Sequence, residues 1–212
     1  MNSTTPLTPE LLRRAMSYDE YMQLIEEELA QGRTTGTDQS EWLVDYARLN
    51  LQRMQRLNKT LVLLEELRQA LDKLQQPQLW VVLTEGWCGD AAQIVPVLAK
   101  VAAYSHKIGL KLLLRDEYPQ VMDAYLTNGT RSIPKLIALE PEHLQELGTW
   151  GPRPKAAQDV VNEFKSNPQG RTKEDFTYLV HKWYADNKTL DTQHELLESL
   201  QQWDTINNKK GA

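Results

Sequence analysis

Residues 84–98 read TEGWCGDAAQIVPVL and join two apolar segments that differ in their residue pattern. The first segment, QLWVVLTEG (78–86), is short, apolar and β-branched, which predicts a buried strand. The second segment, DAAQIVPVLAKVAAYSHKIG (90–109), predicts a helix that contains Pro96 and ends at Gly109. Cys88, the single cysteine of the chain, therefore lies where a strand passes into a helix.

Further strands and helices follow in an order that predicts the sheet. LKLLLRD (110–116) is typical of a second buried strand, and YPQVMDAYLTNG (118–129) of a helix that stops at Asn128–Gly129. PKLIALE (134–140) and LQELGTWG (144–151) indicate two strands around a turn, and RPKAAQDVVNEFKSN (153–167) indicates a helix. A β-α-β unit implies a parallel pair, and two successive strands supply an antiparallel pair. We therefore predict an α/β fold, an open mixed sheet with helices on both faces.

Helical patterns flank this region on both sides. Apolar residues recur at helical spacings in 11–29, 43–74, 176–187 and 192–203. We expect a helix break near Asn58, and we expect the leucine stripe around it to pack on the protein's own core, with a dimer contact less favoured. The predicted domains are an N-terminal helical extension (1–76), a central sheet domain (77–166) and a C-terminal helical extension (167–212). The polar ends, 1–9 and 204–212, are expected to be loosely ordered.

Composition restricts the class of protein. The chain has 212 residues and a formal net charge of -5, which argues against a nucleic-acid-binding surface. No apolar run approaches the roughly 18 residues of a membrane span, and the N-terminus has no apolar core of a secretory signal. One cysteine cannot form an internal disulfide. We predict a cytoplasmic protein that binds neither nucleic acid nor membrane, with its oligomeric state left open.

The position of Cys88 favours thiol chemistry. Open α/β sheets place reactive groups beyond the carboxyl ends of their strands. Free N–H groups at a helix N-terminus stabilise a thiolate and lower the pKa of its thiol, whereas a carboxylate such as Asp90 raises it. Asp90 could instead cap the helix. We expect the sulfur at an accessible sheet edge, and the net direction of its pKa shift stays open.

Three separated stretches now resemble one family. WCGDAAQIVPVL resembles the thioredoxin segment Trp-Cys-Gly-Pro-Cys and the helix with an interior proline that follows it. RSIPKLIAL resembles the cis-proline loop, which makes Pro134 the candidate, and ELGTWG resembles the final strand. The resemblance covers roughly 78–166 and implies a thioredoxin-like central domain with Cys88 as the catalytic residue. It also implies a substrate-binding groove made of Trp87, Gly89, Asp90, Ile133, Pro134, Trp150 and Gly151.

The departures from the family pattern agree with one another. Ala91 occupies the position of the second cysteine, Asp90 that of the intervening proline, and Val82 that of the buried acid on the strand. The resemblance therefore does not extend to the dithiol–disulfide cycle. We expect Glu85 to be an exposed residue at a strand end. We also expect Arg153 to point outward, although an inward Arg153 would offset Asp90.

Three interpretations remain open. In the first, Cys88 carries out thiol–disulfide exchange through a mixed disulfide that an external thiol resolves, with a protein thiol or disulfide or a low-molecular-weight thiol as partner. In the second, the chain is a non-catalytic binding module for a protein partner. The third and least favoured is an iron–sulfur cluster, as in single-cysteine members of the glutaredoxin group. The histidines are scattered, so we predict no metal and no cofactor, at His106, His143, His181 and His194 or elsewhere.

Overall fold

A four-stranded mixed sheet forms the centre of the molecule. The computed structural model describes residues 6–210, in which β1 (Gln78–Thr84) lies between β2 (Ile108–Leu114) and β3 (Lys135–Leu139). β1 is parallel to β2 and antiparallel to β3, and β4 (Glu146–Trp150) is antiparallel to β3 at the edge. The predicted α/β sheet with one parallel pair and an antiparallel pair is therefore confirmed.

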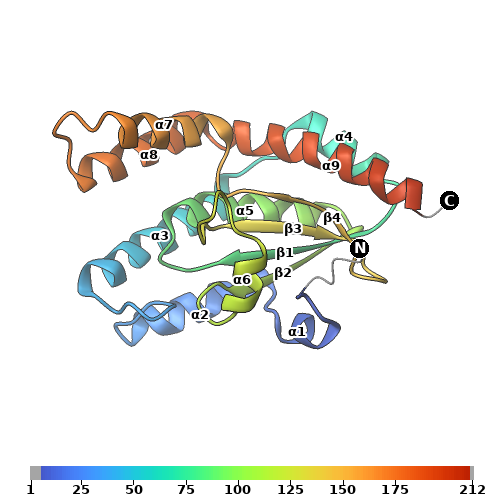
Figure 1. Ribbon diagram of the computed structural model, residues 1–212, viewed down its shortest axis with the longest axis horizontal. Helices are drawn as coiled ribbons and strands as arrows, with labels where there is room; N and C mark the ends of the chain where they lie inside the picture. Colours follow the sequence, from blue (N-terminus) through green and yellow to red (C-terminus); the bar gives the residue numbers. More distant parts are fainter. Residues whose placement is uncertain (1–5, 211–212) are drawn as a thin grey trace.

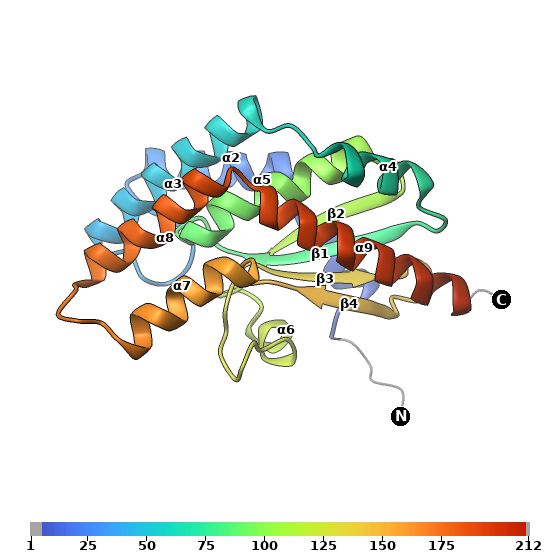
Figure 2. The ribbon, with the colours of Figure 1, turned by 90° about the horizontal axis from the view of Figure 1, so that it is seen from above.

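Helices cover the sheet on both sides (Figure 1). In that view α4, α5 and α9 lie above the strands, whereas α1 and α2 lie below them. Figure 2 shows α9 running along the sheet, and α9 packs against β4 and α4. The helices have these bounds: α1 Pro9–Arg14, α2 Tyr18–Ala30, α3 Glu41–Thr60, α4 Glu65–Lys73, α5 Gly89–Tyr104, α6 Pro119–Ala124, α7 Lys155–Ser166, α8 Lys173–Asn187 and α9 Leu190–Lys210.

The terminal helices share one hydrophobic core with the sheet. The hydroxyl groups of Tyr21 on α2 and Thr84 on β1 lie 3.1 Å apart, and both side chains are buried. On the other side, the ring of Trp203 on α9 meets the buried ring of Trp80 on β1 edge to face, with centroids 6.0 Å apart. A buried aromatic side chain contributes roughly 3 kcal/mol or more to the free energy of unfolding. The flanking helices therefore take part in stabilising the sheet.

Several predicted helix boundaries are wrong. α5 ends at Tyr104, and β2 begins four residues later, at Ile108. Gly109 therefore lies within β2, where it pairs with Leu79 of β1. α6 ends at Ala124 rather than at Asn128–Gly129, and these two residues form a turn with φ of 51° and 74°. Such positive φ values suit asparagine and glycine, and here they belong to the turn that follows the helix.

The break near Asn58 falls slightly later than expected. α3 continues through Asn58 to Thr60, and residues 61–64 form the extended link to α4. The side-chain oxygen of Asn58 accepts a hydrogen bond of 2.9 Å from the hydroxyl group of Tyr18 on α2. This polar oxygen therefore has a partner although Asn58 lies inside α3.

Both chain ends are more ordered than predicted where the structure describes them. Leu7 is 1% exposed and α9 reaches Lys210, while residues 1–5 and 211–212 lie outside the described residues. Within residues 6–210, none of the helices combines the length and the apolar character that a bilayer crossing requires.

Candidate functional site

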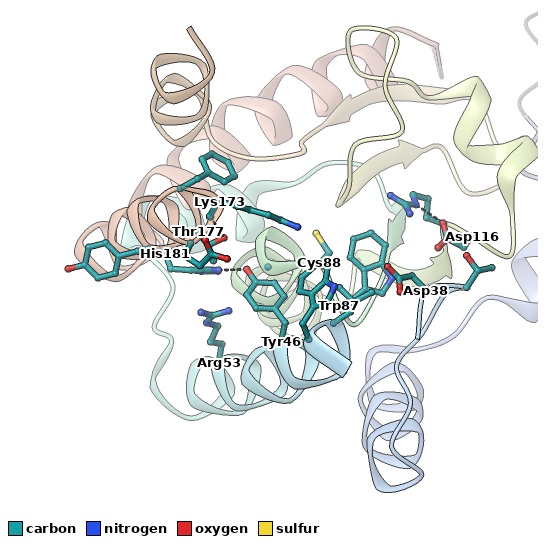
Figure 3. A pocket seen from close by; sticks show the side chains of 17 residues that line it. Asp38, Tyr46, Arg53, Trp87, Cys88, Asp116, Lys173, Thr177 and His181 are labelled. Atoms are coloured by element: carbon teal, nitrogen blue, oxygen red, sulfur yellow. Dashed lines mark hydrogen bonds and ion pairs between the residues drawn. The ribbon is translucent and has the colours of Figure 1, made fainter. Parts of the chain in front are cut away.

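A pocket of about 1010 Å³ lies where the start of α5 meets α3 and α8 (Figure 3). Trp87, Cys88 and Gly89 form one wall of this cavity, which is called the Cys88 pocket below. Side chains of α3 and of α8 form the walls around it, and Arg115 and Asp116 lie at the end of β2. The segment around Cys88 is thus enclosed by helices that precede and follow the sheet.

The sulfur of Cys88 is less accessible than expected. Cys88 is 8% exposed, and its Sγ donates to the carbonyl oxygen of Ile133 at 3.4 Å and accepts from the N–H of Ala91 at 3.5 Å. Burial raises the pKa of the thiol to about 12, and the Asp90 carboxylate acts in the same direction against the helix N–H groups and Arg153. The expectation of an accessible sulfur is therefore wrong, and the net direction of the pKa shift is upward.

The helices on either side of Gly89 account for this burial. An added Cβ at Gly89 would meet the Tyr46 hydroxyl of α3, and it would lie 3.0 Å from the His181 ring of α8. Such an approach leaves no room for a side chain at this position. α3 and α8 therefore close over the start of α5, beside Cys88.

Asp90 and Arg153 form a largely buried ion pair. The Arg153 guanidinium donates twice to one Asp90 oxygen, with Nε at 3.1 Å, and the Tyr184 hydroxyl donates to the other at 2.7 Å. The two side chains are 12% and 17% exposed. The expectation that Arg153 points outward is wrong, and so is the helix-capping role of Asp90, because the N-cap residue is Cys88.

Glu85 is buried, which corrects the expectation that it is exposed. It has no exposed surface, and one of its oxygens accepts a hydrogen bond of 2.9 Å from the N–H of Asp116. The loop before α3 covers it, since the Thr35 hydroxyl accepts from the N–H of Gly86 at 2.8 Å. Burial raises the pKa of Glu85 to about 7, so this carboxyl group is partly protonated near neutral pH.

The structure divides the predicted groove residues between two places. Trp87 and Gly89 line the pocket, together with Cys88. Ile133 and Pro134 are buried beside the sulfur, and their connecting peptide bond is cis. Gly151 lies against them, because an added Cβ there would meet the carbonyl oxygen of Pro134.

Trp150, the remaining predicted groove residue, is 9% exposed and lies next to α9. Its indole N–H donates to Glu195 at 2.9 Å, and the same carboxylate accepts from the N–H of Lys155 at 2.7 Å. α9 therefore covers the indole of Trp150, which was expected to face a substrate.

Among the pocket residues that the sequence analysis missed as site residues, Tyr46, Arg53 and His181 form one cluster. The hydroxyl group of Tyr46 on α3 and Nε2 of His181 on α8 are joined by a hydrogen bond of 2.5 Å (Figure 3). Arg53, two helical turns after Tyr46, lies 5.4 Å from the centre of the Tyr46 ring. Burial and the charge of Arg53 lower the pKa of His181 to about 4, so its ring is neutral at pH 7. Helical spacing puts Tyr46 and Arg53 on one face, but no local signal predicts that this face meets His181.

Potential metal ligands gather away from Cys88. In the part of the chain that the structure describes, Glu140, Glu142 and His143 bring their donor atoms within 4.8 Å of one another. They lie in the turn between β3 and β4, and two of the three are exposed. Cys88 is not a member of this group.

The sequence and the structure were compared with protein families, curated proteins and solved structures. The family model described as Thioredoxin matches residues 36–165, which include α3 and α4 as well as the sheet. No curated protein matches the sequence. A solved structure of a protein of unknown function from Pseudomonas aeruginosa is 15% identical with a TM-score of 0.57, and the match covers 95% of this chain and 96% of that chain. An HIV epitope-scaffold is 18% identical with a TM-score of 0.48, covering 93% and 99%. The likeness to the Pseudomonas protein shows the fold alone.

Proposed function

The chain belongs to the thioredoxin family, and from this premise we propose that it is a non-catalytic thioredoxin-fold binding protein whose ligand occupies the Cys88 pocket. The observation that carries the proposal is the composition of the pocket walls. Trp87, Cys88 and Gly89 come from the segment that resembles the reactive site of the family, whereas the facing walls come from α3 and α8. A volume of about 1010 Å³ suits a small-molecule ligand or a short peptide segment.

Two further features support binding rather than dithiol chemistry. A dithiol–disulfide cycle needs two sulfurs, and Ala91 is found where the family has its second cysteine. The remaining thiol is a weak nucleophile at neutral pH, because its pKa is raised to about 12 and only the thiolate attacks a disulfide.

A bulky substitution in the pocket tests the proposal. Thr177 is a half-buried pocket residue on α8, and Thr177→Trp should fill part of the cavity. We expect it to weaken binding of the uncharged fluorescent probe N-phenyl-1-naphthylamine about 10-fold or more, measured by fluorescence titration. Ala185→Trp is the matched control, because Ala185 is exposed on the same helix and lies outside the pocket. Equal affinities of the wild type and both variants would refute the pocket as a binding site.

Thiol–disulfide exchange is the second candidate function, and one observation favours it. Cys88 is one of the pocket residues, so a disulfide or a low-molecular-weight thiol bound there would lie beside this cysteine. The N–H of Ala91 and the Arg153 guanidinium both favour the thiolate, although burial outweighs them.

Alkylation of Cys88 separates the two functions. Since Cys88 is the single cysteine, every carboxamidomethyl group that iodoacetamide adds to sulfur reports on it. We expect alkylation of the folded chain at pH 7 to be about 100-fold or more slower than that of the urea-unfolded chain. Mass spectrometry of quenched samples gives both rates, and the unfolded chain is the control for intrinsic reactivity. A folded chain that reacts as fast as the unfolded one would favour thiol exchange.

A further inference from the structure

We propose that the ligand of the Cys88 pocket is a small molecule with a flat aromatic ring that carries an anionic group, and that Arg53 binds this group. The inference rests on the proposed function and names its class of ligand. It follows from the distribution of charge and of aromatic side chains over the pocket walls.

Arg53 lines the pocket and forms no ion pair with a carboxylate of residues 6–206. Its guanidinium is half-buried, donates to the side-chain oxygen of Asn50 at 2.8 Å and lies over the Tyr46 ring. None of its ion-pair or hydrogen-bond partners in residues 6–206 is a carboxylate. A partly desolvated guanidinium of this kind gains from an anionic partner, and its planar fork suits a carboxylate, a phosphate or a sulfonate.

The acidic pocket residues lie elsewhere or are already paired. Asp116 forms an ion pair of 2.7 Å with Arg115, and the exposed Asp38 accepts a hydrogen bond from the N–H of Ser40. Glu174 is exposed in the first turn of α8. Figure 3 shows Arg53 at the Tyr46 end of the pocket, opposite Asp38 and Asp116. Asp90 also acts on Tyr46 and His181, but it is paired with Arg153, so Arg53 is the unpaired charge among the residues described at this end.

His181 lies at the same end of the pocket as a neutral, partly buried neighbour of Arg53. Its Nδ1 is buried and has no hydrogen-bond partner within the described residues, while Nε2 is bonded to the Tyr46 hydroxyl. When that hydroxyl donates to Nε2, the ring proton is on Nδ1 and lacks an acceptor.

Aromatic side chains supply the surface for a ring. Trp42, Trp87, Phe176 and Tyr178 line the pocket together with Tyr46. Trp42 is 53% exposed and Tyr178 is 66% exposed, although both are large and largely apolar. Lys173 already lies over the Trp42 ring, with its Nζ 4.2 Å from the ring centre, so a flat ligand that covers exposed aromatic surface here would also lie beside an ammonium group.

Two probes that share one ring system test the ligand class. 8-Anilinonaphthalene-1-sulfonate carries a sulfonate that N-phenyl-1-naphthylamine lacks. We expect Arg53→Gln to weaken binding of the sulfonate about 10-fold and to change binding of the uncharged probe less than about 2-fold. Arg53→Lys should stay within about 3-fold of the wild type for both. Arg48→Gln removes the same charge from an exposed position on α3 outside the pocket, so it should bind both probes as the wild type does.

The outcomes separate this inference from the proposed function. If Arg53→Gln affects neither probe, or weakens both equally, the anionic ligand class is refuted while the pocket stands. If Thr177→Trp fails to reduce binding of either probe, the pocket itself fails. Should Arg53→Gln not fold, the wild type still decides, since raising NaCl from about 50 to about 500 mM should weaken the sulfonate alone. Equal salt dependence of the two probes would overturn the inference.

Discussion

Gly151→Ala is expected to lower the free energy of unfolding by about 3 kcal/mol or more. Gly151 has a φ of +109°, a backbone conformation that residues with a Cβ rarely adopt. The added Cβ would also meet the carbonyl oxygen of Pro134, which belongs to the backbone and has little freedom to move. The two effects add, because the position of an alanine Cβ is fixed by the backbone, so no rotamer can move it away from Pro134. Urea unfolding followed by circular dichroism measures the loss.

Gly129→Ala is the control for the cost of placing a Cβ at a positive φ without a steric clash. Gly129 also has a positive φ, 74°, but an added Cβ there has no neighbouring atom within 4 Å among those described. We expect this variant to lose only about 1 kcal/mol. If both variants lose the same amount, the contact between Gly151 and the proline loop contributes nothing to stability, contrary to the structure.

The strands were predictable because their signals are local. The apolar run of β1 and the change of pattern at Cys88 suffice to place a strand, a tight connection and a helix, and the structure agrees. The family follows from short motifs in the right order, and the match over 36–165 bears it out. Helix ends were less predictable, since Gly109 lies within β2 rather than at the end of α5, and α6 ends at Ala124, before the turn at Asn128–Gly129.

The pocket could not be predicted, because its residues are distant in sequence. Tyr46 and His181 are 135 positions apart, and each sits in a helix whose own pattern indicates only which face is apolar. Glu85 is buried by a loop some 50 residues earlier, and nothing next to it in sequence marks it as covered. An exposed glutamate after a strand is the ordinary case, so the local rule failed where a distant segment intervened.

Asp90→Asn is expected to lower the free energy of unfolding by about 3 kcal/mol, because it leaves the guanidinium of Arg153 largely buried without a counter-charge. The Tyr184 hydroxyl can still donate to the amide oxygen, so most of the loss should come from Arg153. A double-mutant cycle with Arg153→Met isolates the interaction between the two side chains. The double variant should lose less free energy of unfolding than the sum of the losses of the two single variants. Asp186→Asn is the matched surface control, because its pair with Lys182 is more than half exposed and should contribute at most about 0.5 kcal/mol.

The same substitution should also act on Cys88. Burial is the main reason that the pKa of the thiol is raised, and Asp90 is the second, so Asp90→Asn should lower this pKa while leaving it above that of a free cysteine. Alkylation of the folded variant should therefore be faster than that of the folded wild type and still slower than that of the unfolded chain. A variant that loses no stability, or a thiol whose reactivity does not change, would contradict the role of this ion pair. Asp90 would then not be the residue that both anchors Arg153 beneath α8 and holds the neighbouring sulfur in its neutral form.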